Sequence, residues 1–103
     1  MVAIIYSTIG DIKEARQIAH TLVEEQNVAC VNIIPSIESV YKWKGKVEDA
    51  KECVLIAKTV DENIQKTILR IKELHSYDLP DVIVLPIVGG SKEYLEYIAR
   101  ETS

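Results

Sequence analysis

The stretch Ile37–Asp49, IESVYKWKGKVED, decides how this chain of 103 residues folds. It contains the only tryptophan of the chain, Trp43, two positions after Tyr41, with lysines between and after the two rings. Gly45 follows directly in a short polar interruption between two strand-like runs. A glycine in such a short link is typical of a β-hairpin turn. The stretch therefore predicts the tip of a hairpin.

The residues on both sides of this tip extend the hairpin. From residue 28 to residue 43 the odd-numbered positions are apolar except for Ser39, which is the period of two expected of a β-strand. The partner strand runs from about residue 46 to residue 59, with acidic residues in its first half and CVLIAKT in its second. The two runs together predict an unusually long hairpin.

A strand and a helix precede the hairpin. Residues 2–9 are almost continuously apolar, as in a strand that is covered and central in its sheet. The helix that follows is expected to begin after Asp11 as N-cap, with Glu14 completing a capping box, and to end near Asn27 in the left-handed conformation. Its apolar positions recur at helical spacing: Ile12, Ala15, Ala19, Leu22 and Val23.

A second helix, a strand and a third helix follow the hairpin. Asp61 is the expected N-cap of the second helix, and Pro80 prevents its continuation. The run DVIVLPIV, residues 81–88, reads as the last strand, and Ser91 is the expected N-cap of a short final helix.

The order of these elements predicts the fold. Strand, helix, strand, strand, helix, strand is the split βαβ or ferredoxin-like α+β arrangement, here with an additional C-terminal helix and within a single domain spanning residues 1–103. Right-handed crossovers place the first and third strands in the centre of the sheet and the other two at its edges. Pro35 and Pro86 agree with this order, because both fall in the predicted edge strands, where a missing N–H breaks no ladder.

The hairpin is too long for a domain of this size. A domain of this length has a radius of gyration of about 13 Å and is about 33 Å across, whereas residues 29–43 span about 50 Å when extended. If the hairpin projects, its exposed rings need cover from another subunit. We therefore predict a subunit interface at Pro35, Ile37, Tyr41 and Trp43. In the alternative, Pro35 folds the hairpin back and Trp43 caps the core of its own subunit.

Composition excludes several classes of protein. The formal net charge is −4 and the isoelectric point is about 5.1, so no general basic footprint for nucleic acid or for an anionic membrane exists. No apolar run approaches the length of a membrane helix, and the first residues lack the features of a signal peptide. The two cysteines form no CxxC motif, and in the predicted pairing they lie too far apart for a disulfide. We expect a cytoplasmic protein.

His75 and Asp81 are the candidate metal ligands. A turn containing Tyr77 and Pro80 separates them, so an imidazole and a carboxylate can converge on a divalent ion. Two ligands make a weak site. The alternative is that the His75 imidazole caps the carbonyl end of the second helix.

Three stretches together identify a family. ACVNIIPSIESVYKWKGKV, then ECVLIAKT, then ELHSYDLPDVIVLPIVGGSKEYLEYI resemble the CutA divalent-cation-tolerance family over nearly the whole chain. The resemblance implies a homotrimer assembled through the long hairpins, similar in architecture to the PII signalling proteins. It also implies a cytoplasmic protein linked to tolerance of divalent metals, with copper binding proposed and no enzymatic reaction.

The resemblance assigns positions as well. His75 matches the histidine suggested as a metal ligand in the family, and Asp81 stands where many members have glutamate. Ser7 stands where some bacterial members have a cysteine invoked for copper, and a hydroxyl in place of that thiolate predicts weak binding of Cu(II) or another divalent cation at most. No cofactor is required.

Other functions fit the same strand order less well. An RNA-binding module of this topology needs aromatic residues on its central strands and a basic surface, and the central strands here offer mainly Tyr6. A metallochaperone needs a CxxC pair after the first strand, where this chain has STIGD. No nucleophile and base at recognisable spacing indicate an enzyme. A PII-like trimer that binds a small ligand between subunits remains the alternative function.

Overall fold

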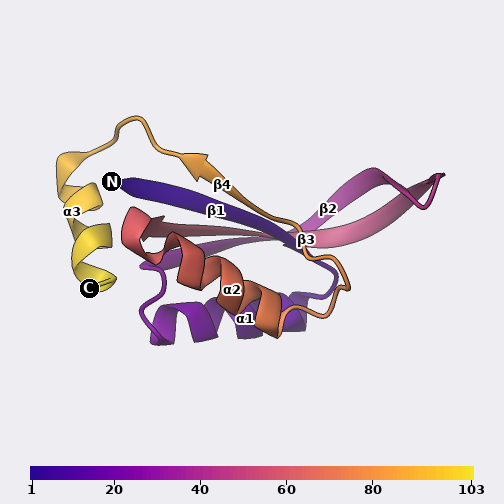
Figure 1. Ribbon diagram of the computed structural model, residues 1–103, viewed down its shortest axis with the longest axis horizontal. Coiled ribbons are helices and arrows are strands. Elements are labelled where there is room, and N and C mark those ends of the chain that lie inside the picture. Colours follow the sequence, from indigo (N-terminus) through magenta and orange to yellow (C-terminus); the bar gives the residue numbers. More distant parts are fainter.

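A four-stranded antiparallel sheet with the strand order β2-β3-β1-β4 forms the centre of the computed structural model, which describes residues 1–103 (Figure 1). In chain order the elements are β1 (Val2–Ile9), α1 (Ile12–Glu24), β2 (Cys30–Trp43), β3 (Lys46–Val60), the 3₁₀ turn η1 (Asp61–Asn63), α2 (Ile64–Leu74), β4 (Val82–Pro86) and α3 (Lys92–Glu101). The predicted ferredoxin-like fold, with β1 and β3 central and β2 and β4 at the edges, is confirmed. Pro35 and Pro86 both lie in edge strands, as expected.

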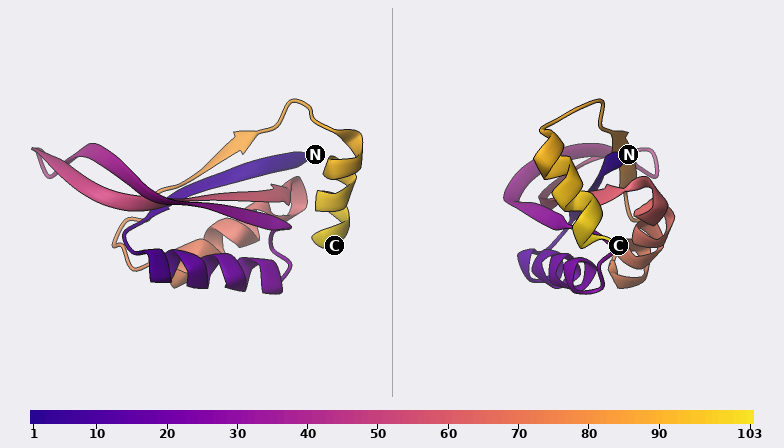
Figure 2. Two further views of the ribbon diagram at one scale, coloured as in Figure 1. Left: turned by 180° about the vertical axis from the view of Figure 1, so that it is seen from behind. Right: turned by 90° about the vertical axis from the view of Figure 1, so that its left-hand side faces the viewer.

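The main core lies between one face of the sheet and the helices α1 and α2 (Figure 2). Because side chains alternate across a strand, the odd-numbered residues of β1 and β3 point toward the helices. They pack against Ile18, Leu22 and Ile71 of the helices, and the strand side chains of this core are Ile5, Ile9, Cys53, Leu55 and Ala57. The opposite face of the sheet is covered only at one end, where α3 packs on Val2 and Val60; the rest of this face has no helix over it.

Helix α3 closes one end of the sheet, away from the hairpin (Figure 2). Ile98, its one buried residue, forms a second small core with Val2, Ala29 and Val60. Tyr94 of the same helix remains exposed.

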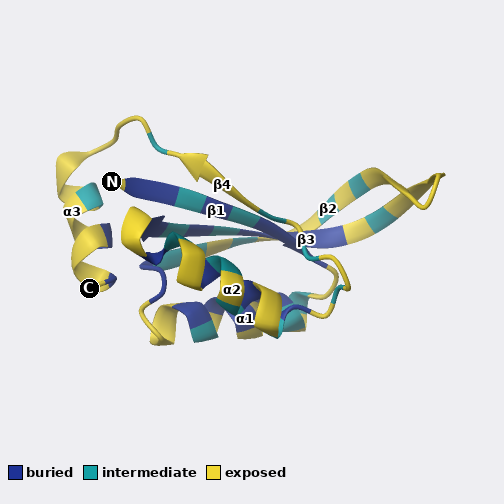
Figure 3. Cartoon of the chain, viewed as in Figure 1, coloured by how far each residue is buried: buried dark blue, intermediate teal, exposed yellow.

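The β2–β3 hairpin projects beyond the helices, as the length mismatch predicts (Figures 1 and 3). The molecule extends 45 × 26 × 22 Å, and its radius of gyration is 14.1 Å. Lys44 and Gly45 join the strands with φ values of 50° and 81°, the positive values that a tight turn matching the twist of a hairpin requires. Pro35 does not fold the hairpin back. No salt bridge joins the lysines of the tip to Glu48, Asp49 or Glu52.

A β-bulge at Pro35 and Ser36 reverses the faces of β2. Ile34 pairs with Val54 but Ile37 pairs with Glu52, so two residues of β2 oppose the single residue Cys53. One extra residue exchanges the two faces of a strand. Odd positions before the bulge therefore point toward the helices, and odd positions beyond it point to the uncovered face. The Cys53 thiol donates a hydrogen bond to the Pro35 carbonyl oxygen over 3.2 Å and ties the bulge to β3.

The predicted helix caps are confirmed only in part. Asp11 accepts a hydrogen bond from the Lys13 N–H as predicted, but the Glu14 carboxylate binds Ser76 instead of closing a capping box. The left-handed residue after α1 is Gln26, with φ 61°, and not Asn27. No side chain caps the start of η1, α2 or α3. The turn η1 displaces the start of α2, so Asn63 and not Asp61 is its N-cap residue. Ser91 is the N-cap residue of α3, as predicted, but its hydroxyl binds Glu93.

Asn63 joins three segments that are distant in sequence. Its side-chain amide donates hydrogen bonds to the carbonyl oxygens of Gln26, Asn27 and Thr102 over 3.1 to 3.3 Å. The Thr59 hydroxyl donates to the same Asn27 carbonyl over 2.6 Å. These buried bonds fix the end of α1 and the C-terminus against the start of α2.

We expect Asn63→Ala to lower the free energy of unfolding by about 1–3 kcal/mol, because the substitution leaves buried carbonyl groups without donors. Chemical denaturation with urea measures the loss. Asn32→Ala, which removes an exposed amide in β2, is the matched control and should change stability by less than about 0.5 kcal/mol. Equal stabilities of the two variants would contradict the role given to Asn63.

Candidate functional site

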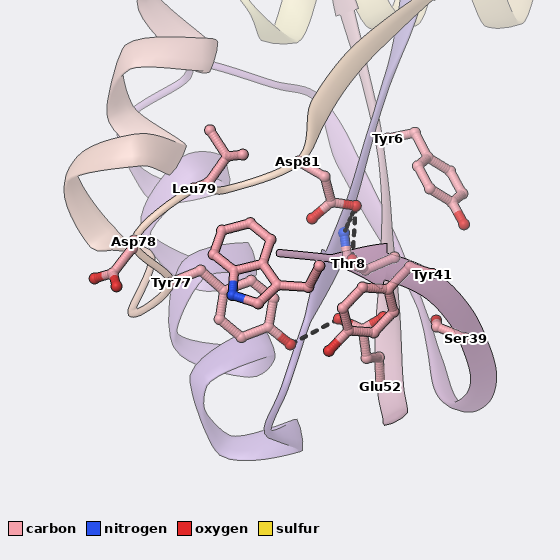
Figure 4. Close-up of a pocket in the computed structure, with 10 residues that line it drawn as sticks. Tyr6, Thr8, Ser39, Tyr41, Glu52, Tyr77, Asp78, Leu79 and Asp81 are labelled. Atoms are coloured by element: carbon pink, nitrogen blue, oxygen red, sulfur yellow. Dashed lines mark hydrogen bonds between the residues drawn. The ribbon is translucent and has the colours of Figure 1, made fainter. Parts of the chain in front are cut away.

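A cavity of about 500 Å³ lies at the base of the hairpin, between β1 and the loop from α2 to β4 (Figure 4). The bulge places Ser39, Tyr41 and Trp43 along it, since these odd positions of β2 face away from the helices only beyond Pro35. Its lining residues are Tyr6, Thr8, Ser39, Tyr41, Trp43, Glu52, Tyr77, Asp78, Leu79 and Asp81.

Glu52 and Tyr77 form the hydrogen-bonded floor of this cavity. The Tyr77 hydroxyl donates to Glu52 Oε2 over 2.7 Å, and Glu52 is only 9% exposed (Figure 4). Gly10 makes room for the tyrosine: a Cβ atom at this position would lie 2.9 Å from the Tyr77 hydroxyl oxygen. Any other residue at position 10 would therefore displace the ring that holds Glu52.

Asp81 fastens the start of β4 to β1. One of its oxygens, Oδ2, accepts hydrogen bonds from the Thr8 hydroxyl over 2.6 Å and from the Thr8 N–H over 3.2 Å. The same carboxylate lines the cavity (Figure 4). Asp81 thus has one oxygen occupied by a structural contact and contributes negative charge to the cavity wall.

The His75 side chain is fully buried and lies outside the cavity lining. Its Nε2 lies 2.8 Å from the Thr8 carbonyl oxygen, and the Tyr77 N–H donates to its Nδ1 over 3.1 Å. In this arrangement Nε2 donates to the Thr8 carbonyl oxygen and Nδ1 accepts from the Tyr77 N–H. The imidazole therefore does not cap the carbonyl end of α2; it binds β1 instead, and only the His75 backbone N–H reaches α2, at Ile71.

The electrostatic character of the cavity is acidic. Burial by itself raises the pKa of Glu52, but the hydroxyls of Ser39, Tyr77 and Thr8 outweigh it, and the net effect lowers the pKa below the usual 4.5. Burial, together with the hydrogen bond to Glu52, raises the pKa of the Tyr77 phenol. Glu52 is consequently the charged partner and Tyr77 the neutral donor at physiological pH.

The structure places the predicted site residues in different surroundings. Tyr41 and Trp43 are 45% and 43% exposed, so their own chain covers about half of each ring. Pro35 is exposed and Ile37 half-buried. Ser7 points into the main core, fully buried, and its hydroxyl has no hydrogen-bond partner. Cys30 and Cys53 are free thiols; Cys30 pairs with Lys58, five positions from Cys53, so the predicted separation is confirmed.

Sequence reasoning missed the pairing of Glu52 with Tyr77. The two residues are 25 positions apart, and no motif connects them. Glu52 read as one of several acidic residues on a solvated hairpin, and Tyr77 read as part of a turn. Gly10, between the first strand and the first helix, is the one local signal that another side chain approaches the backbone closely at this point.

Of the two metal ligands proposed from sequence, Asp81 keeps one carboxylate oxygen free, whereas His75 has no free ring nitrogen. Both ring nitrogens of His75 are in hydrogen-bond contact, and no group of three histidine, cysteine, aspartate or glutamate residues could hold a metal ion. A metal at His75 would have to displace Thr8 or Tyr77. The site at His75 and Asp81 stays a prediction, and the residues as arranged fit weak binding better than a preformed chelate.

Fold and site together define a class: ferredoxin-like domains with a projecting hairpin, a largely uncovered sheet face and an acidic, aromatic cavity at the hairpin base. The CutA1 divalent ion tolerance protein family model matches residues 3–101, and the chain belongs to this family.

Individual relatives agree with this assignment. The chain is 39% identical to the divalent-cation tolerance protein CutA of Thermus thermophilus over 102 residues, covering 99% of both chains. It is 41% identical to the chloroplastic protein CutA of Arabidopsis thaliana, covering 96% of this chain but 54% of that one, so it spans about half the length of the plant relative. The PII-like protein CutA from Nostoc in apo form superimposes with a TM-score of 0.91 at 34% identity, covering 98% and 97% of the two chains.

None of the three helices is both long and apolar enough to cross a membrane.

We expect Tyr77→Phe to raise the pKa of Glu52, because the variant lacks the phenol that donates to the carboxylate. The pKa of Glu52 is lowered in the folded protein, so its ionised form stabilises the fold above the usual glutamate value, and this contribution is lost as the pH falls through the folded pKa. Removing a hydrogen bond to a charged group should cost about 1.5–3 kcal/mol at pH 7 and less at pH 3.

Carboxyl NMR titration and urea denaturation at both pH values measure these two effects. Tyr6→Phe, which changes a cavity tyrosine without a hydrogen bond to Glu52, is the matched control. A Glu52 pKa that is the same in Tyr77→Phe and in the original protein would contradict the assignment.

Proposed function

We propose that this chain acts as a non-catalytic homotrimer of the divalent-cation tolerance type, located in the cytoplasm. The observation that supports it is the uncovered sheet face. Ile34, Ile83 and Leu85 point to that face and are each more than 40% exposed, and Tyr41 and Trp43 extend it along the hairpin. Apolar surface of this extent is typical of a protein interface.

Both edges of the sheet support assembly as well. β2 and β4 each have one side without a neighbouring strand, and exposed edges pair readily with other chains. A closed ring of identical subunits uses one edge of each copy against the other edge of the next, so no edge remains free. The family resemblance supports three copies, and the projecting hairpin is long enough to contact a neighbouring copy.

Two observations support a non-catalytic cytoplasmic protein. Neither Cys53 nor Ser7 is free to act as a nucleophile. The Cys53 thiol donates a hydrogen bond to a backbone carbonyl inside the sheet, and Ser7 is fully buried with no hydrogen-bond partner. Both cysteines are free thiols, as is usual in a reducing compartment.

For the metal we propose weak association of Cu(II) or another divalent cation, with Asp81 as the accessible ligand and His75 as the ligand that must first exchange a hydrogen bond. Asp81 lines the cavity, which supports its access to solvent ions. No cofactor is required for folding in this proposal.

A second function is binding of a small organic ligand, as in a PII-like signalling trimer. The cavity supports it, because a volume of about 500 Å³ lies within the usual range for small-molecule sites.

Sedimentation equilibrium is expected to give three times the 11.6 kDa mass of one chain. Leu85→Asp, which places a charge on the uncovered sheet face, should dissociate the assembly and weaken it at least 100-fold. Val88→Asp, in the fully exposed loop after β4, is the matched control and should leave the mass unchanged. A monomeric original protein would contradict the proposed assembly.

Calorimetric titration with Cu(II) and Zn(II) tests the metal proposal. His75→Gln keeps a donor for the Thr8 carbonyl and removes the imidazole, and Asp81→Asn removes the carboxylate charge; each should weaken binding at least tenfold. Glu62→Gln, an exposed carboxylate of η1, is the control. Binding that is unchanged in both site variants would remove this site from consideration.

A further inference from the structure

The cavity combines aromatic rings with negative charge and has no positive residue in its lining. Glu52, Asp78 and Asp81 are its acidic groups, and its lining residues include no lysine, arginine or histidine. The Glu52 carboxylate is nine-tenths buried; hydroxyl groups bind it, but no residue of opposite sign in the cavity lining offsets the remaining cost of its charge. A subunit that covers the uncovered face would increase this cost. The cavity is therefore suited to a cation.

The rings on the cavity wall suit a particular kind of cation. Tyr6, Tyr41 and Trp43 line the same cavity as the carboxylates, and the faces of such rings attract ammonium groups. One ring of the cavity already has such a contact, because the Lys44 ammonium lies 5.9 Å from the centre of the Trp43 ring. Quaternary and methylated ammonium ions are the ligands that cages of aromatic rings typically bind.

A bare metal ion fits the same walls less well. Hard divalent ions require six or more oxygen ligands at 2.0–2.6 Å, roughly, in a tight shell. Here Tyr77 occupies one oxygen of Glu52 and Thr8 occupies one oxygen of Asp81. About 500 Å³ also exceeds the space around a single ion and corresponds to an organic molecule. An anionic ligand would be repelled by all three carboxylates.

We propose that the cavity at the hairpin base binds an organic ammonium ion, held by the Glu52, Asp78 and Asp81 carboxylates and the rings of Tyr41 and Trp43. The inference deepens the second proposed function, small-ligand binding, and names its ligand class. It does not depend on the metal site at His75.

Trp43 gives a direct readout, since it is the only tryptophan and lies in the cavity wall. The test is a titration of the assembled protein with choline, followed by Trp43 fluorescence and by calorimetry. The neutral isostere 3,3-dimethylbutan-1-ol, which has a carbon in place of the nitrogen, is the matched ligand control. Choline should give a saturable change with at least tenfold tighter binding than the isostere, and spermidine should compete with it.

Two variants locate the site. Glu52→Gln should weaken choline binding at least tenfold, and Asp78→Asn, which alters an exposed carboxylate and keeps the fold intact, should weaken it about threefold. Glu62→Gln lies outside the cavity and should bind choline like the original protein. Sedimentation of each variant confirms that its assembly is unchanged.

The proposal is overturned if neither choline nor spermidine binds saturably, if the neutral isostere binds as tightly, or if Asp78→Asn and Glu52→Gln both bind choline unchanged. Zn(II) binding without ammonium binding also overturns it, while leaving the proposed cation-tolerance function standing. A monomer that binds choline with the predicted selectivity supports the ligand class and contradicts only the proposed trimer.

Discussion

The paired length of β2 and β3 is the constraint on which the rest of this structure depends. The hairpin extends beyond the helices (Figure 1), so its outer part has no core of its own to enter. Backbone hydrogen bonds of the ladder hold the projecting part, while the apolar side chains near its tip remain about half exposed. Exposed apolar surface of this kind lowers solubility, and burial against another subunit would remove that effect.

The bulge at Pro35 turns the odd-numbered side chains of outer β2 toward the cavity. Without the extra residue, Tyr41 and Trp43 would point to the side of the helices and away from β1. With it, they share a face with Tyr6 and Thr8 and enclose a cavity. The missing N–H of Pro35 is tolerated because β2 is an edge strand, and the Cys53 thiol uses the Pro35 carbonyl as acceptor. A free thiol thus has a structural role at the centre of the sheet.

Hydrogen bonds from three residues, His75, Tyr77 and Asp81, connect the segment between α2 and β4 to the rest of the cavity. His75 and Asp81 both bind Thr8, one through its carbonyl oxygen and the other through its N–H and hydroxyl. Tyr77 lies between these two residues in sequence and reaches Glu52. The segment His75–Asp81 is therefore held at both ends and presents its tyrosine in a defined position. The residues that read as metal ligands in the sequence have at least this structural role.

The sequence alone predicted the element order, the strand order and the projecting hairpin. The period of two in residues 28–43 and the helical spacing in residues 12–23 indicated the element order, because each depends on neighbours along the chain. The handedness of the crossovers then gave the strand order, and the prolines agreed with it. The projection of the hairpin followed from a comparison of its extended length with the diameter of the domain. The faces of β2 beyond Pro35, the Glu52–Tyr77 bond, the contacts of His75 and the Asn63 bonds were decided only by the tertiary structure. These features depend on one inserted residue or on partners that are 25 to 67 positions apart. No periodicity records a contact of that kind, since it exists only once the sheet and helices have packed together.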